Sequence, residues 1–195
     1  MHEEIYIAGI GGQGALSMGQ LLALAATSEN KEVSYVPFYG PEKRGGFANC
    51  GVTISDRPVS SPIISEPSVL VVMNNLSLKN YEDSVIPGGI IIVNSSMVNL
   101  GVKRSDVHVV SIQASEEAEL LGDVRITNSV ILGALIELTG VVSVGAVEKS
   151  LEQILPKRNL DMIPINLKAL KKGAELARDY KKAWNNLSQT DASLK

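Results

Sequence analysis

Short apolar runs alternate along the chain with longer segments whose hydrophobic residues recur at helical spacing. The run at 5–8 leads into a glycine-rich turn, and the runs at 69–73 and 90–93 contain no polar residue. Unbroken runs of this kind are typical of strands that are covered on both faces of a sheet. Two further strands are expected at 32–36 and 107–112. The alternation favours an α/β fold over a helical bundle or a β-sandwich.

Segments with helical periodicity lie between several of these strands and make up most of the last third of the chain. They predict helices at 13–27, 78–85, 115–121, 128–138, 144–155 and 167–184. Ser115 and Ser143 stand where N-caps are expected, and Gly140 stands where the fourth helix should stop. No linker or internal repeat divides the chain. Residues 1–184 are therefore expected to form one domain, with a flexible polar tail at 185–195.

The segment 47–55 alternates in the manner of a strand with two different faces. One face carries Ala48, Cys50, Val52 and Ile54. A turn at 55–58 follows, and residues 59–64 are expected to return as the hairpin partner. The sequence thus predicts a Rossmann-like α/β fold: a mixed, mostly parallel sheet with flanking helices, a β-hairpin insertion and a helical C-terminus.

Composition and charge narrow the functional classes. The 195 residues carry a net charge of −3, which argues against a broad nucleic-acid-binding face. A lone cysteine, Cys50, cannot form an internal disulfide or ligate an iron–sulfur cluster within one chain, and with His2 and His108 it makes a poor zinc set. No signal peptide or membrane span is evident, so a cytoplasmic protein is expected.

No catalytic or metal-binding residue is predicted. Cys50 lies on the inward-facing side of its strand, where a small buried hydrophobe is the simplest interpretation. His108, within an apolar strand, is interpreted as a structural histidine. Neither histidine is placed by the sequence as a base for a nucleophile, and the acidic residues form no paired motif.

The segment 9–14 matches G-x-G-x-x-G between a predicted strand and a predicted helix. Such a loop lets backbone amides approach an anion at the helix N-terminus. A tight turn that binds nothing, or that packs against another chain, is the alternative. The candidate cofactor-binding residues are Gly9, Gly11, Gly12, Gln13 and Gly14. NAD is disfavoured, because residues 36–38 at the end of the second strand include no acid to hold a ribose.

A second loop, at 38–46, follows the second strand, where open α/β sheets place their ligand crevice. Its glycines flank several polar side chains, and the guanidinium of Arg44 suits a carboxylate or phosphate. A solvated charged loop is the alternative interpretation.

Several motifs occur in an order that resembles a known family, the gamma subunits of the 2-oxoacid:ferredoxin oxidoreductases. They are the segments 9–14, 39–46, 48–50, 55–58 with Ser61-Pro62, 128–134 and 163–170. The stretch 44–50 is most similar to the 2-oxoglutarate branch, since pyruvate-type chains more often read Arg-Arg-Gly-Ala-Pro there. Phe38 and Phe47 depart from the usual pattern.

The resemblance implies a non-catalytic subunit of a multisubunit enzyme. That enzyme decarboxylates a 2-oxoacid on thiamine diphosphate, passes electrons through iron–sulfur clusters to ferredoxin, and transfers the acyl group to coenzyme A. Thiamine diphosphate, magnesium and the clusters would lie on alpha, beta and delta-type partners, with no cofactor resident in this chain. The residues expected to contact a partner or coenzyme A are Tyr39, Glu42, Lys43, Arg44, Gly45, Gly46 and Asn49.

The sequence leaves several functions open. A pyruvate or branched-chain version of the same complex, a free-standing nucleotide-binding protein and a pure assembly module all fit the motifs. Alone, the chain is expected to be inactive and could form a homodimer.

Overall fold

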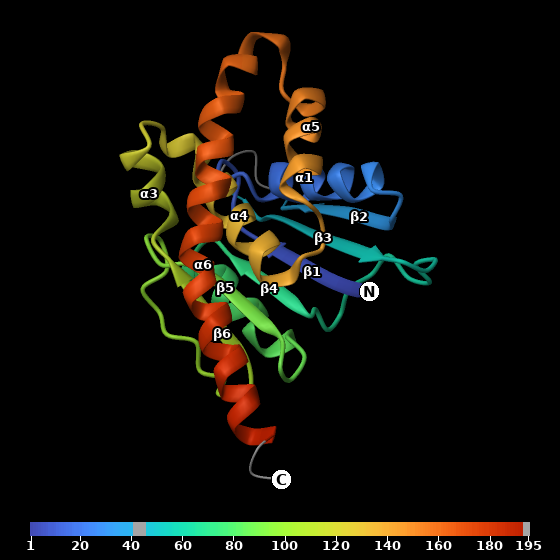
Figure 1. Cartoon of the computed structure of the whole chain (residues 1–195), viewed down its shortest axis with the longest axis vertical. Helices are drawn as coiled ribbons and strands as arrows, with labels where there is room; N and C mark the ends of the chain where they lie inside the picture. Colours follow the sequence, from blue (N-terminus) through green and yellow to red (C-terminus); the bar gives the residue numbers. More distant parts are fainter. Residues whose placement is uncertain (41–45, 193–195) are drawn as a thin grey trace.

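Six strands form a single sheet in the computed structural model, which describes residues 1–40 and 46–192, with side chains up to 184. The strands are β1 (His2–Ala8), β2 (Glu32–Tyr39), β3 (Ala48–Ser55), β4 (Val69–Val72), β5 (Ile90–Asn94) and β6 (His108–Ile112). Their order is β2-β3-β1-β4-β5-β6 (Figure 1). The strands β1, β4, β5 and β6 run parallel to one another, whereas β3 runs antiparallel to both of its neighbours, β1 and β2. The predicted mixed, mostly parallel sheet is confirmed.

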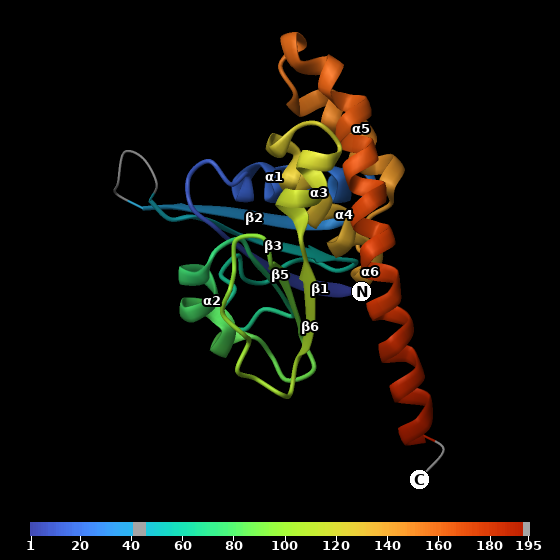
Figure 2. The same cartoon turned by 90° about the vertical axis from the view of Figure 1, so that its left-hand side faces the viewer.

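Helices cover both faces of this sheet (Figure 2). They are α1 (Ala15–Ser28), α2 (Asn75–Tyr81), α3 (Ala114–Leu120), α4 (Thr127–Thr139), α5 (Val144–Ile154) and α6 (Ile163–Ala192), with short 3-10 turns η1 (Glu82–Ser84), η2 (Val124–Ile126) and η3 (Lys157–Met162). One apolar core joins the sheet to α1, α4 and α6, and a smaller core on the opposite face includes Leu78 of α2. No helix in the described part of the chain is long and apolar enough to cross a membrane.

The hairpin partner of β3 is β2, so the prediction that residues 59–64 pair with β3 is wrong. Residues 59–64 form no strand. Ile64 from that segment instead packs over Gly51, while α1 covers the other face of β3, and all eight residues of β3 are buried. β2 also runs past Pro37 to Tyr39, three residues further than predicted. A proline is tolerated there because β2 is an edge strand.

Two of the three predicted helix signals are confirmed. Ser143 Oγ accepts a hydrogen bond from the amide of Ala146 at 3.1 Å, and Gly140 ends α4 with a φ of 66°. The predicted cap at Ser115 is wrong: α3 begins one residue earlier, and the amide of Ser115 donates to Ser96 Oγ at 3.1 Å. The start of α3 is thus tied to the turn after β5.

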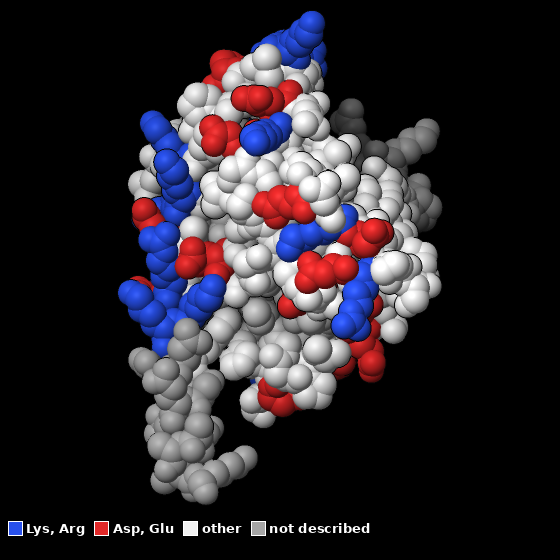
Figure 3. All heavy atoms as spheres, turned by 45° about the vertical axis from the view of Figure 1, so that its right-hand side comes forward, with Lys and Arg blue, Asp and Glu red and all other residues white. Residues whose placement is uncertain are grey.

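The helix α6 begins earlier and ends later than its periodicity indicates. Pro164 occupies its first turn, where the missing amide hydrogen costs no helical hydrogen bond. Its backbone stays helical to Ala192, so most of the segment 185–195 continues this helix; the flexibility of that segment stays a prediction. Lys and Arg side chains form a column along α6 (Figure 3).

Candidate functional site

The glycine-rich loop and the segment that leads into β3 are joined at the carboxyl edge of the parallel strands. The amide of Gly11 donates to the carbonyl of Gly46 at 2.9 Å, and the amide of Ala48 donates to the carbonyl of Gly9 at 3.1 Å. An isolated bridge pairs Ile10 with Phe47. The structure therefore brings together two motifs that lie more than thirty residues apart in the sequence.

The second loop is described only at its two ends. Tyr39 ends β2 and is 74% exposed, which fits its expected role as a contact residue. The carbonyl oxygen of Gly46 accepts a hydrogen bond from the amide of Gly11 in the glycine-rich loop. The remaining expected contact residues, Glu42, Lys43, Arg44 and Gly45, lie outside the described residues.

Gln13 fixes the glycine-rich loop from inside. Its Oε1 accepts hydrogen bonds from the amide of Ile10 at 3.0 Å and from Asn74 Nδ2 at 2.9 Å. Its Nε2 donates to the carbonyl of Met73 at 2.9 Å. These three hydrogen bonds hold the loop in place, so Gln13 positions the loop.

Asn49 supports the same loop from beneath. Only 2% of its surface is exposed; its Oδ1 accepts from the amide of Gly9 at 3.0 Å, and its Nδ2 donates to the hydroxyl of Tyr81 at 2.9 Å. The tilted rings of Tyr81 and Tyr6 lie 4.8 Å apart, and burial, the largest cause, raises the pKa of Tyr6. Asn49 was expected to contact a partner or coenzyme A; in this structure it is a buried positioning residue.

Two glycine amides of the loop make no hydrogen bond within the described part of the chain. Those of Gly9, Gly11 and Gln13 bond within the chain, whereas those of Gly12 and Gly14 have no partner among the described residues. Gly14 precedes α1 with a φ of 75°, and a Cβ there would lie 2.8 Å from the Asn128 side chain. A side chain is therefore excluded by both backbone conformation and space. Gly12 is exposed shortly before the N-terminus of α1, whose partial positive charge favours an anion.

A pocket of about 230 Å³ lies beside this loop, at the carboxyl ends of β4 and β5. It is lined by Gly12, Gln13, Met73, Asn94, Met97, Ser115, Val124, Arg125 and Thr127. Asn94 ends β5 and is 1% exposed; its Nδ2 donates to Ser115 Oγ at 3.2 Å, whereas its Oδ1 has no partner in the described structure. Ligands of open α/β sheets bind in crevices at this edge. We call this pocket the loop crevice.

Arg125 supplies the cation of the loop crevice. Its Nε and Nη2 donate to the two carboxylate oxygens of Asp123, at 2.9 and 2.6 Å. These hydrogen bonds hold the pKa of Asp123 below its ordinary value. The Arg125 side chain is 74% exposed, and its Nη1 has no partner among the described residues, so it can reach an anion. Sequence reasoning missed both Arg125 and Asn94; the position of Asn94 at the end of an unbroken apolar strand was the available signal.

Neither Cys50 nor His108 belongs to a reactive centre. Cys50 is fully buried, and burial raises the pKa of its thiol to about 12, which confirms its interpretation as a small buried hydrophobe. His108 is exposed rather than enclosed, and its ring lies 4.6 Å from that of Trp184. No group of three or more His, Cys, Asp or Glu residues within the described ranges could hold a metal ion.

The fold and the loop crevice together define a Rossmann-like domain with a pocket at the carboxyl edge of its sheet. The profile of the pyruvate ferredoxin/flavodoxin oxidoreductase family matches residues 4–176. The chain belongs to this family.

Its relatives include proteins of similar length and proteins that are much longer. The chain is 36% identical over 185 residues to the 2-oxoglutarate synthase subunit KorC of Methanocaldococcus jannaschii, covering 92% of this chain and 96% of KorC. It is 41% identical over 179 residues to the ketoisovalerate oxidoreductase subunit VorA of Methanothermobacter thermautotrophicus. That match covers 90% of this chain and only 36% of VorA.

Solved structures agree with the sequence relatives. The gamma subunit of a keto/oxoacid ferredoxin oxidoreductase from Geobacter sulfurreducens superposes with a TM-score of 0.77 at 30% identity, covering 91% of this chain and 99% of that one. A 2-oxoglutarate:ferredoxin oxidoreductase chain from Magnetococcus marinus gives a TM-score of 0.83 at 26% identity, covering 91% of this chain and 31% of that one. The resemblance to gamma subunits is confirmed.

Proposed function

We propose that this chain is the gamma subunit of a 2-oxoglutarate:ferredoxin oxidoreductase and that its loop crevice holds coenzyme A. The match to KorC, a 2-oxoglutarate synthase subunit, extends over nearly the full length of both chains and supports the substrate. The related Magnetococcus marinus enzyme was solved with 2-oxoglutarate, coenzyme A and succinyl-CoA bound, which supports the cosubstrate. In this proposal the chain contributes binding and assembly, and its partners carry out the oxidative decarboxylation.

The residues of this chain do not fit the other cofactors of such an enzyme. The single cysteine, Cys50, is buried, and the described residues contain no group of three or more His, Cys, Asp or Glu side chains that could hold a metal ion. We therefore assign thiamine diphosphate, magnesium and the iron–sulfur clusters to the alpha, beta and delta-type partner subunits. Ferredoxin would be reduced through those partners.

One observation carries the coenzyme A proposal: Gly12, whose amide has no partner among the described residues, lines the loop crevice together with Arg125, just before the N-terminus of α1. Backbone amides at a helix N-terminus and a free guanidinium edge both favour phosphate oxygens. When bound, coenzyme A supplies the thiol that accepts the acyl group. This chain's part is to hold the phosphate end. Arg44, outside the described residues, stays a predicted second anion contact.

Replacing Arg125 by glutamine tests the cosubstrate site. In the assembled enzyme, Arg125→Gln should raise the KM for coenzyme A about tenfold, equivalent to about 1.4 kcal/mol of binding, and leave the KM for the 2-oxoacid unchanged. Arg57→Gln, which removes an exposed arginine from the turn after β3, is the matched control. An unchanged KM for coenzyme A in Arg125→Gln would contradict the proposed site.

A second candidate substrate is ketoisovalerate, favoured by the 41% identity to VorA. The complex purified from its native source should be assayed with 2-oxoglutarate, ketoisovalerate and pyruvate under identical conditions. We expect 2-oxoglutarate to give the highest kcat/KM for coenzyme A-dependent reduction of ferredoxin. A higher kcat/KM with ketoisovalerate would assign the chain to the branched-chain enzyme.

A free-standing nucleotide-binding protein is the least supported alternative. The carboxyl end of β2 carries Val36, Pro37 and Phe38, with no acidic side chain for a ribose hydroxyl. Titration calorimetry of the chain with NAD and NADP should show no saturable binding. Micromolar NAD binding would revive this alternative.

A further inference from the structure

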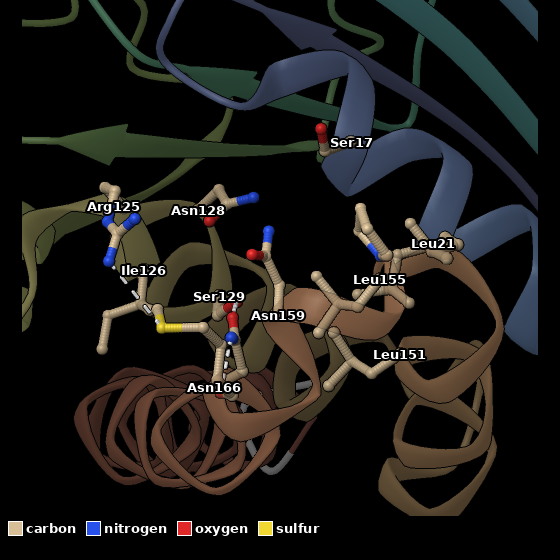
Figure 4. Close-up of a pocket in the computed structure, with 13 residues that line it drawn as sticks. Ser17, Leu21, Arg125, Ile126, Asn128, Ser129, Leu151, Leu155, Asn159 and Asn166 are labelled. Atoms are coloured by element: carbon tan, nitrogen blue, oxygen red, sulfur yellow. Dashed lines mark hydrogen bonds between the residues drawn. The ribbon is translucent and has the colours of Figure 1, made fainter.

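A second pocket, of about 310 Å³, lies between α1, α4, α5 and the start of α6 (Figure 4). It shares only Arg125 with the loop crevice. Its size lies at the small end of the range for ligand pockets, which runs from about 300 to 1,000 Å³. The proposed function makes no use of this pocket, which we call the helix pocket.

Unpaired neutral polar groups converge on one side of the helix pocket. The amide ends of Asn128 and Asn159 point toward the same space, and the hydroxyl of Ser17 lies beyond them (Figure 4). None of these three side chains has a hydrogen-bond partner within the described part of the chain. Ser129 and Asn166 differ, because Ser129 Oγ bonds to Asn166 Oδ1 at 2.6 Å and Asn166 Nδ2 donates to the carbonyl of Met162. The first three groups are thus available to an occupant, and the last two are structural.

The opposite side of the helix pocket is apolar. Figure 4 shows Leu21, Leu151 and Leu155 together, across the pocket from Arg125 and Asn128. The full apolar lining is Leu21, Ile126, Leu151, Ile154, Leu155, Pro156 and Met162. This lining suits one aliphatic side chain, which loses its contact with water on entering.

Charge further restricts the occupant. Arg125 is the one charged residue of the lining, and Asp123 already binds it through two hydrogen bonds. Because the remaining edge of Arg125 serves the loop crevice in the proposed function, the polar groups left to an occupant of the helix pocket are the neutral carboxamides of Asn128 and Asn159. A carboxamide side chain offers both a donor and an acceptor, which are the complements of the carbonyl and the N–H of a peptide group.

We infer that the helix pocket receives an extended peptide segment from a partner subunit. One aliphatic side chain of that segment lies among Leu21, Leu151 and Leu155, and its neighbouring peptide groups pair with Asn128 and Asn159. The matched region makes up 36% of VorA and 31% of the Magnetococcus marinus chain, so both of those chains carry further polypeptide from which such a segment could come.

Asparagine variants test this interface in the reconstituted complex. Asn128→Ala and Asn159→Ala should each weaken the affinity of the chain for its partner subunits about fivefold to tenfold, with the thermal midpoint of the chain unchanged. Leu160→Ala is the matched control, because Leu160 lies next to Asn159 on η3, is 40% exposed and does not line the pocket. Asn159→Gln, which keeps the carboxamide, should recover part of the lost affinity.

A photo-crosslinking residue at position 159 of the assembled complex identifies the occupant. We expect a crosslink to one partner peptide that contains an aliphatic residue. The KM for coenzyme A should be the same in the Asn159→Ala complex as in the unmodified one, which separates this inference from the loop crevice. Equal affinities of the asparagine variants and the Leu160→Ala control, or crosslinks confined to this chain or to coenzyme A, would overturn the inference.

Discussion

Cys50 illustrates how the interior of this protein changes the chemistry of one side chain. The thiol lies between β3 and α1, where a Cβ added to Gly19 would overlap its sulfur. Burial is the main reason that its pKa rises to about 12, from about 8.5 in an exposed cysteine. The folded protein therefore keeps the thiol protonated over a pH range in which the unfolded chain loses the proton.

This difference predicts a loss of stability in mild alkali. Because the folded pKa is raised, the contribution of Cys50 is complete below about pH 8.5 and declines as the pH rises toward 12, by at most about 1.4 kcal/mol per pH unit. Urea unfolding between pH 8.5 and 10 measures the slope before most tyrosines titrate. Cys50→Ala should show a shallower decline; identical slopes would place the thiol in contact with water.

At the scale of the elements, the crossing of α4 and α6 depends on two glycines. A Cβ on Gly133 would overlap the carbonyl oxygen of Leu170, and one on Gly173 would overlap the carbonyl oxygen of Val130. The obstacle in both cases is the backbone of the other helix, which cannot rotate away as a side chain does. The two helices must move apart to accept any larger residue.

Alanine at either glycine should therefore destabilise the protein. We expect Gly133→Ala and Gly173→Ala each to lower the free energy of unfolding by about 1–3 kcal/mol, the usual cost of overpacking. Gly145→Ala is the control, because that glycine lies in α5 with no atom closer than Ser143 Oγ at 3.9 Å. Helix propensity should make this variant neutral or more stable by up to about 1 kcal/mol. Urea unfolding distinguishes the three variants, and equal losses in all of them would refute the close crossing.

At the scale of the whole molecule, the two pockets proposed as binding sites are neighbours. The loop crevice and the helix pocket meet at Arg125 and flank the N-terminus of α1 on different sides. A partner bound in one pocket would lie close to a cosubstrate bound in the other. Such an arrangement suits a subunit that presents a cosubstrate to chemistry on neighbouring chains.

The purified chain alone should accordingly show no turnover. Incubated with 2-oxoglutarate, coenzyme A and ferredoxin, it should reduce no ferredoxin, and its visible spectrum should lack iron–sulfur absorption. Adding the partner subunits should restore activity in proportion to the complex formed. Iron–sulfur absorption by the isolated chain, or reduction of ferredoxin without the partner subunits, would contradict the proposal that the cofactors lie on those partners.

The sequence by itself determined most of the strands and helices, because burial on one or both faces leaves a local periodicity; the strand expected at 59–64 is the exception. It also located the glycine-rich loop, whose glycines and following helix are adjacent in the chain. The runs at 69–73 and 90–93 became β4 and β5 almost residue for residue, and Ser143 became the predicted cap.

Only the tertiary structure decided how these segments meet. The pairing of β3 with β2, the burial of Asn49 beneath the loop and the use of the Gln13 side chain all depend on contacts across the fold. Both pockets likewise join α1 or its loop to Arg125, more than a hundred residues away. Periodicity records whether a residue is buried but not what it is buried against, and the two sites are defined by those partners.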